Sequence, residues 1–528
     1  MDVYVGTEAI KEFGEFFQAG RQRFAFDSPE ILSYLDLGDA TTASNSGNVF
    51  RDYSLFSQFG KFNYAYADKY LVQVIVRNDA SSRFLSASRN AVFPAFSLGW
   101  RLSEEAAVKS ALPFVTDMKL RYGWGKTGNQ AIGDYNAYTT YRSNIFNAGY
   151  PIDGSTSSPT IGFDAQRFGN PNAKWETTTS NNLGLDVLMF GDKVNLEFDV
   201  WQRVTTDMLF TIPITFSAGD AGAPSSNVGK ITNKGIDLNL GYKNTANGGD
   251  FRYGISGNIS TYRNNVDRLD GNEGTRFFGF GSRVPAVTLT QAGLPLSSYY
   301  GFNVLGIFQT QEEAAAHATY GTYNAPGKFK IEDVDNDGEI TDADRTVIGN
   351  PHPDFTYGVN VNLGYKNFEF TIFGSGSVGN DIFNYVRYFA DFNTFQGNRS
   401  KAALYDAWQP SNPTAPKSQW TAANPNATAP IMDANDQVSS RPSSYFIEDG
   451  SYFRIRNIQL SYNLPATTLS KIGFSRASVY VQGQNLVTFT KYSGLNPEIQ
   501  TNTDNTLGFD GGYMPVSKNF LVGLNLNF

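Results

Sequence analysis

The sequence contains no cysteine, which excludes disulfides, thiolate metal sites and a cysteine nucleophile. It has only two histidines, His317 and His352, and neither has a second histidine at a metal-binding spacing. Neither a G-x-S-x-G nucleophile motif nor a phosphate-binding P-loop is present. We therefore expect no catalytic site in this chain.

Charge and long apolar runs are also scarce. Charged residues make up 17% of the chain, and the net charge of −8 comes without a basic cluster, which argues against a nucleic-acid partner. No run approaches the roughly 18 apolar residues of a membrane helix, and the N-terminal residues do not resemble an export signal. Aromatic residues, in contrast, reach 15%. A membrane β-barrel explains this combination, because its strands alternate apolar and polar residues.

Alternation with a period of two dominates the chain. Roughly fifteen runs show it, among them residues 2–8, 297–309 and 352–367. The polar positions carry Asn, Gly, Thr and charge, as a wet lumen needs, while aromatic residues stand at the ends of the runs. The pattern predicts an all-β, transmembrane antiparallel β-barrel. A soluble β-sandwich is the alternative that period two alone leaves open.

The connections between runs are of two kinds. Gly191-Asp192 and Lys366-Asn367 read as tight periplasmic turns. Four long segments instead read as extracellular loops: 128–173, 270–296, 310–351 and 381–450. Short helices are expected near 103–107 and 310–314, the second because Thr310 and Glu313 have capping-box spacing.

The chain ends in strict alternation, with Leu524, Leu526 and Phe528 at every second position. This resembles the closing strand that the outer-membrane assembly machinery recognises, and we interpret these residues as an assembly signal. An ordinary amphipathic last strand is the alternative.

Residues 333–344 match the spacing of an EF-hand-type calcium loop. Asp333, Asp335 and Asp337 fall at positions 1, 3 and 5, and Glu339 would offer its backbone carbonyl at position 7. Asp344 stands at position 12, where a shorter carboxylate than Glu reaches the ion less easily. So many carboxylates in one loop repel one another unless a cation is present. The sequence predicts a structural calcium ion that pins an extracellular loop insertion, 310–351, with a solvated acidic turn as the alternative.

Several phrases in one order along the chain resemble the SusC-like family of TonB-dependent outer-membrane transporters. They lie at residues 64–71, 76–84, 99–105, 120–130, 175–176, 233–236, 348–351, 449–456 and 484–486. The resemblance implies a 22-stranded barrel, an N-terminal plug and a segment that contacts TonB. It also implies a SusD-like surface lipoprotein that closes the barrel as a lid. On this reading residues 1–528 are the C-terminal portion of an incomplete barrel, and the plug and first strands would precede them.

The resemblance implies import of oligosaccharides or, in some members, of peptides across the outer membrane. Aromatic rings in the loop after Asp381 can stack on sugar rings, and the candidates are Tyr385, Tyr388, Phe389, Phe392 and Trp408. The alternative is that these rings pack the loops against one another or against the lid. Two other kinds of protein stay open: a passive porin or adhesin, and a secreted calcium-binding carbohydrate-binding protein.

Overall fold

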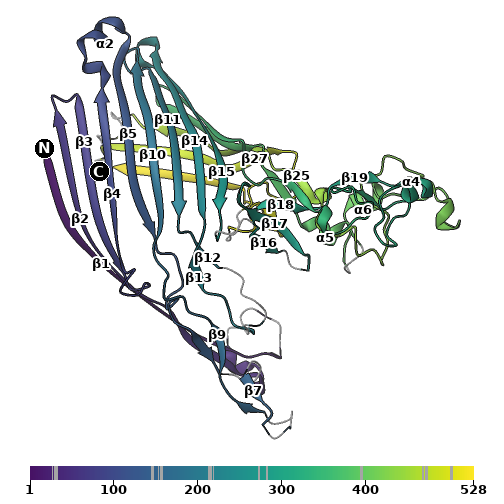
Figure 1. The fold of residues 1–528 in the computed structure, drawn as a ribbon. Helices are drawn as coiled ribbons and strands as arrows, with labels where there is room; N and C mark the ends of the chain where they lie inside the picture. Colours follow the sequence, from purple (N-terminus) through teal and green to yellow (C-terminus); the bar gives the residue numbers. More distant parts are fainter. Residues whose placement is uncertain are drawn as a thin grey trace. The chain divides into compact units, whose positions relative to one another are not determined.

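The computed structural model of the chain shows the succession of elements in Figure 1. The structure describes residues 1–25, 28, 34–143, 148–152, 154, 159–211, 217, 219–270, 274–280, 283–392, 397–465, 469, 474–499 and 504–527. None of the helices in these ranges is both long enough and apolar enough to span a membrane.

A 14-stranded antiparallel sheet dominates the fold, and its strands follow one another in chain order. The strands are β1 (Asp2–Gly20), β2 (Ser44–Tyr66), β3 (Tyr70–Ser81), β4 (Asn90–Arg101), β5 (Val115–Asn129), β10 (Glu176–Met189), β11 (Val194–Thr206), β14 (Lys230–Ala246), β15 (Phe251–Arg268), β22 (Phe355–Tyr365), β23 (Phe368–Val378), β26 (Tyr452–Asn463), β27 (Arg476–Thr490) and β29 (Asn519–Asn527). A sheet of successive hairpins is what alternating runs joined by turns predict.

Most predicted runs match these strands, and the runs at 297–309 and 2–8 show the clearest differences. The run at 297–309 is not part of the large sheet, because its residues form β18 (Ser298–Gly301) and β19 (Val304–Ile307) in two small sheets. The run at 2–8 is only the start of β1, which continues to Gly20 in register with β2. Alternation fades beyond residue 8, so the pattern underestimates this strand.

The two predicted tight turns are confirmed. β22 ends at Tyr365 and β23 begins at Phe368, and Lys366 between them has a positive φ of 50°. Gly191 and Asp192, between β10 and β11, both have φ of 65°. Such left-handed residues give the backbone the twist that a tight hairpin needs.

The chain divides into two compact units, the first comprising residues 1–99, 122–181 and 204–230. Its buried core joins Phe84 and Phe93 to Trp175, with ring centroids 5.3 and 5.5 Å from the Trp175 ring. The indole N–H of Trp175 donates to the Arg89 carbonyl, 3.1 Å away. Several short hairpin strands complete this unit: β6 (Thr140–Arg142), β7 (Gly149–Tyr150), β8 (Thr160–Ile161), β9 (Asp164–Arg167), β12 (Leu209–Thr211) and β13 (Ser225–Asn227).

The second unit comprises residues 100–121, 182–203 and 231–528. Its long connections fold into small sheets and short helices rather than remaining irregular. The strands are β16 (Arg276–Phe280), β17 (Ala286–Gln291), β20 (Phe329–Ile331), β21 (Thr346–Gly349), β24 (Asp381–Asn384), β25 (Ile447–Asp449) and β28 (Phe509–Asp510). The helices are α2 (Ala106–Ala111), α4 (Gln311–Ala316), α5 (Val386–Ala390) and α6 (Lys401–Tyr405).

The two predicted loop helices lie close to their expected positions. α2 follows the short 3-10 turn Leu102–Glu104. In α4 the Thr310 hydroxyl accepts the Glu313 N–H, as predicted, but the Glu313 carboxylate accepts the N–H of Gln309 rather than that of Thr310. A connected core of buried residues, which we call the loop core, lies among these elements: Val287, Tyr299, Phe302, Phe329, Ile331, Ile340, Phe383, Tyr385, Phe392 and Phe446.

Candidate functional site

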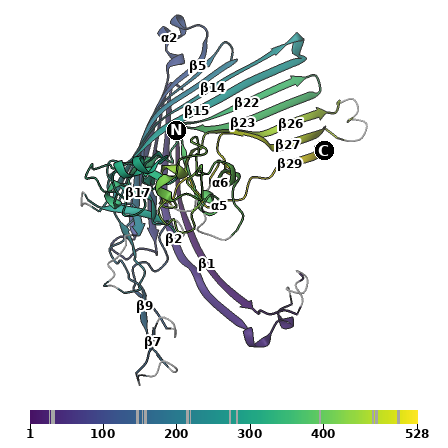
Figure 2. The ribbon, with the colours of Figure 1, turned by 90° about the vertical axis from the view of Figure 1, so that its right-hand side faces the viewer.

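Apolar side chains form continuous rows across the second unit's part of the large sheet. The register places Leu363 opposite both Tyr253 and Phe370, and continues the row to Leu460, Val481 and Val522 on β26, β27 and β29. The strands of this row lie side by side in Figure 2. Val481 and Val522 are 50% and 79% exposed, so the face is apolar yet uncovered. An uncovered apolar face of this extent needs a nonaqueous environment.

An aromatic row borders this face at the tight turns. Phe251, Tyr365, Phe368 and Tyr462 are successive cross-strand partners, and the rings of Phe368 and Tyr462 lie 4.8 Å apart. Rings with a polar edge prefer the boundary between lipid and water. The row therefore marks the level at which the apolar face ends.

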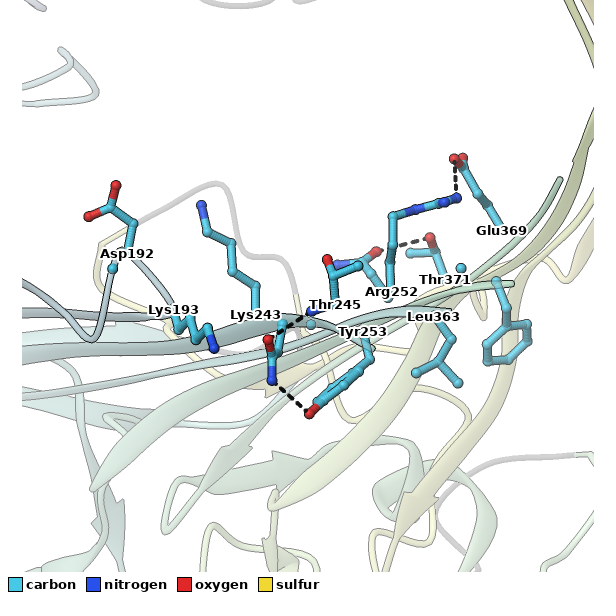
Figure 3. Close-up of a pocket in the computed structure, with 15 residues that line it drawn as sticks. Asp192, Lys193, Lys243, Thr245, Arg252, Tyr253, Leu363, Glu369 and Thr371 are labelled. Atoms are coloured by element: carbon cyan, nitrogen blue, oxygen red, sulfur yellow. Dashed lines mark hydrogen bonds and ion pairs between the residues drawn. The ribbon is translucent and has the colours of Figure 1, made fainter. Parts of the chain in front are cut away.

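The opposite face of the same strands is polar. Asn362, Thr371, Gln459 and Gln482 are successive cross-strand partners, and the Thr371 hydroxyl donates to Asn362 Oδ1 at 3.0 Å. Figure 3 shows the two faces near the turns, with Lys243, Arg252, Glu369 and Thr371 on one side and Tyr253 and Leu363 on the other. The polar side chains border a groove of about 740 Å³. The strands thus have one face for lipid and one for water.

A β-bulge changes which residues of β26 reach the polar face. The register with β27 slips between Ile455 and Asn457. Arg454 and Arg456 both reach Glu498, with N–O distances of 2.8 and 2.9 Å. Burial raises the pKa of the Glu498 carboxyl, but the Arg456 and Arg454 guanidinium groups outweigh this effect and lower it. Glu498 therefore fastens the connection after β27 to the sheet.

Replacing Glu498 by Gln is expected to lower the melting temperature of the detergent-extracted protein, because Arg454 is only 4% exposed and would lose its carboxylate. Removing one partner of a partly buried pair costs about 2–3 kcal/mol. Since the folded-state pKa is lowered, the stabilisation is present above the ordinary glutamate pKa and lost as the pH falls through the lowered value. Glu369→Gln, at the exposed 3.8 Å pair with Arg252, is the control and should change little; equal effects would contradict the prediction.

The acidic loop adopts a compact turn around its carboxylates. One carboxylate oxygen from each of Asp333, Asp335 and Asp337 lies within 4.8 Å of the others. Asp333 Oδ2 accepts the Gly338 N–H at 3.0 Å, while Asp333 Oδ1 is buried without a hydrogen-bond partner among the described residues. Gly338 and Asn336 have positive φ values of 89° and 59°, which the turn requires. The three side chains are thus brought together as the spacing predicts.

The other two predicted ligands occupy different environments. The Glu339 side chain is exposed, and its carboxylate is not part of the cluster that Asp333, Asp335 and Asp337 form. Asp344 is fully buried, and its carboxylate accepts the N–H groups of Val334 and Thr341 at 2.8 and 2.7 Å. Asp344 therefore closes the loop through the backbone. Desolvation, together with the charges of Asp337, Asp344 and Asp333, raises the pKa of the Asp335 carboxyl.

The acidic loop is attached to the loop core by backbone and side-chain contacts. Thr319 donates its N–H to Gly338, and its carbonyl accepts the N–H of Ile340 at 2.7 Å, which seats the Ile340 side chain in the core. Arg441 forms an ion pair of 2.5 Å with Asp342 and stacks on the Phe302 ring. The conformation of the acidic loop is therefore coupled to that of the loop core.

The predicted sugar-stacking residues do not form one open surface. Tyr385, Phe392 and Trp408 are 4%, 5% and 1% exposed. The first two pack in the loop core, and the Trp408 N–H donates to Gln309 at 3.1 Å. For these three the expectation of an open stacking face is wrong, because burial leaves no ring face for a sugar. Tyr388 and Phe389 remain half-buried at the edge of the core.

A cavity that the sequence did not indicate lies beside α5 and α6. It measures about 650 Å³, and its walls come from β24, β25, both helices and residues 493–495 and 510–513. These segments are distant in sequence and each is short, so no local pattern marks them.

The predicted assembly signal is placed in part. Leu524 and Leu526 lie on β29 opposite Val479 and Ala477. Phe528 falls outside the described residues. The role of this segment in assembly stays a prediction.

Comparisons with known proteins give one consistent result. Residues 4–377 match the model of the family described as TonB dependent receptor-like, beta-barrel. The chain is 32% identical to TonB-dependent receptor P3 of Formosa agariphila, over 99% of the chain and 50% of that protein. It is 30% identical to TonB-dependent receptor SusC of Bacteroides thetaiotaomicron, over 90% of the chain and 44% of that protein. These relatives are named as receptors, in line with the expectation that the chain has no enzymatic role.

Among solved structures, the RagAB peptide transporter superposes with a TM-score of 0.77 at 24% identity, over 100% of the chain and 53% of the solved chain. The RagAB peptide importer in its open-open state gives 0.75. At this identity the likeness establishes the fold. The chain spans about half the length of the curated relatives it matches.

Proposed function

The chain belongs to the TonB-dependent receptor-like β-barrel family of outer-membrane proteins, and from this premise we propose that it forms part of an importer driven through TonB. The proposal rests on one observation: a set of neighbouring strands has one apolar and one polar face. These strands are β15, β22, β23, β26, β27 and β29. Apolar rows face lipid, and polar rows border the path that a hydrophilic solute takes. The TonB contact belongs to a longer polypeptide, of the length of the curated relatives.

We propose that the solute is an oligosaccharide or a peptide and that a SusD-like surface lipoprotein covers the loops. The loops of the second unit fold into small sheets around the loop core, which gives such a lid a firm surface. Tyr388 and Phe389 are the remaining candidates for ring stacking, since both are half-buried. TonB-dependent receptor SusC is among the relatives, and the structural neighbours named above are called a peptide transporter and a peptide importer.

We also propose that the acidic loop binds calcium as a structural ion. The clustered oxygens of Asp333, Asp335 and Asp337 suit a hard cation, and Asp333 Oδ1 offers a ligand atom that no described residue uses. The carbonyl of Glu339 and the carboxylate of Asp344 complete the ligand set of such a loop. The ion would stabilise the contacts of Thr319 and Ile340 with the loop core.

A tagged receptor tests the import proposal. An epitope is placed in the native gene at the exposed loop residue Asn426, and the tagged species is purified from detergent-extracted outer membranes. A species of about twice the mass of this chain, accompanied by a surface lipoprotein, is the expected result. A species of this chain's own mass, alone or in the soluble fraction, would overturn the proposal and leave the porin, adhesin or binding-protein alternatives.

A further inference from the structure

The cavity beside α5 and α6 is lined by both apolar and charged side chains. Its carboxylates are fully hydrogen-bonded, whereas its basic groups keep N–H donors that no described residue uses. Val386, Ala390, Ala402 and Leu495 supply the apolar part of its lining, and Leu495 is 72% exposed. Five charged residues also line it: Arg387, Asp391, Lys401, Glu448 and Asp510. Whether these charges are already paired determines which ligand the cavity can take.

The carboxylates of the cavity are all engaged. Asp391 accepts the Ser400 hydroxyl, the Tyr445 hydroxyl at 2.8 Å and Arg387 Nε at 2.8 Å. Asp510 accepts the Tyr492 hydroxyl at 2.5 Å and the N–H groups of Gly512 and Tyr513. These bonds use both oxygens of each carboxylate, and both residues are 3% exposed.

Both carboxylate oxygens of Glu448 also accept hydrogen bonds. It accepts Asn384 Nδ2 at 2.9 Å and both the hydroxyl and the N–H of Ser493 at 2.8 Å. An ionised carboxylate can only accept hydrogen bonds, so the N–H₂ group of Asn384 must face Glu448. This fixes the orientation of the Asn384 amide. Asn384 Oδ1 is then left buried without a hydrogen-bond partner in the described part of the chain.

The cations of the cavity, in contrast, keep unused donors. Arg387 uses Nε for Asp391 and Nη1 for the Tyr445 carbonyl, and its guanidinium lies 3.8 Å from the centroid of the Tyr445 ring. Nη2 has no hydrogen-bond partner within the described ranges, and neither has the exposed Lys401 Nζ. Arg387 is thus held rigidly with one free N–H₂ group, and Lys401 adds a mobile ammonium.

We propose that this cavity binds the C-terminal end of an apolar peptide, with the terminal carboxylate at Arg387 and Lys401 and the last side chain against Val386, Ala390 and Leu495. A charge-assisted pair between a guanidinium and a carboxylate is among the strongest polar contacts. The backbone N–H of the last residue is a donor of the kind that Asn384 Oδ1 lacks. A neutral oligosaccharide would bring no charge to Lys401 or to the unused Nη2 of Arg387, and it would find few aromatic faces here. The inference rests on the proposed function in one respect, that the receptor meets external solutes at these loops.

Calorimetric titration of the full-length receptor, extracted with its partners, tests the proposal with three probes. They are the peptide Ala-Ala-Leu, its C-terminal amide and trigalacturonate, which carries carboxylates without an apolar side chain. The free acid is expected to bind at least about ten-fold more tightly than either of the others. Equal binding of acid and amide, or tighter binding of trigalacturonate, would overturn the proposal. Binding to extracted receptor needs no TonB, so a failure here is distinct from a failure of import.

Two variants place the binding at this cavity. Lys401→Glu should abolish the preference for the free acid, whereas Lys417→Glu, the same change on a lysine outside the cavity, should retain it. Ala402→Trp fills the cavity and should abolish binding of both peptides. If Lys401→Glu and Ala402→Trp both bind like the unchanged protein, the peptide lies elsewhere and the assignment is refuted.

Discussion

Replacing Leu460 and Val481 together by arginine is expected to reduce the folded receptor in the outer membrane by at least about ten-fold. The two residues are direct cross-strand partners on the apolar face, and they are 45% and 50% exposed. An arginine facing lipid costs about 2–4 kcal/mol near the midplane and less toward the interface. Two arginines opposite each other add like-charge repulsion. The measurement is the amount of heat-modifiable receptor in purified outer membranes.

The neighbouring cross-strand pair on the same two strands offers a matched control. Gln459 and Gln482 are also direct cross-strand partners, and they lie on the polar face. The double replacement Gln459→Arg and Gln482→Arg adds the same charge in the same strands with the same cross-strand repulsion. Only the face differs, so this variant should assemble within about two-fold of the unchanged receptor. A similar loss in both variants would refute the assignment of the faces.

The large sheet could be predicted because the sequence features that determine it lie close together along the chain. Alternation along Phe355–Tyr365 fixes which residues share a face, and the tight turn at Lys366 fixes the register with β23. Rows such as Leu363, Phe370 and Leu460 then follow from pairing apolar residues with apolar partners. Three expectations stay predictions: that so few strands leave the barrel incomplete, that a plug precedes them and that a lid covers the loops.

The loops were less predictable because their contacts join distant segments. Tyr385 and Phe392 look like exposed loop aromatics in sequence, yet they meet Phe329 and Phe446 in one core. Arg456 is an extra residue of β26 relative to β23 and has no local signal, so alternation alone cannot give the face of Arg454. The acidic loop is the exception, since the spacing that brings Asp333, Asp335 and Asp337 together is contained in a few consecutive residues.

Removal of calcium is expected to expose the loop core to protease. Trypsin sites at Lys328, Lys330 and Arg345 flank the acidic loop, and Lys328 is only 7% exposed. Cleavage there requires the local structure to open, and a bound ion suppresses opening in proportion to its occupancy. With calcium at ten or more times its dissociation constant, chelation should accelerate cleavage by about ten-fold or more. The cleavage rates are measured by mass spectrometry on the extracted full-length receptor with calcium or with a chelator.

The same chemical change at two positions of the loop distinguishes ion binding from general weakening. Asp333→Asn removes a ligand charge at position 1 and should give rapid cleavage whether or not calcium is present. Glu339→Gln removes a charge whose side chain is exposed, and it should behave like the unchanged receptor.

The raised pKa of Asp335 gives a further expectation for the metal-free loop. Its stability is greatest at low pH and falls as the pH rises through that pKa, because Asp335 must then ionise beside Asp337, Asp344 and Asp333. Calcium should remove this loss at neutral pH, and a calcium effect that is equal in Asp333→Asn and Glu339→Gln would refute the site.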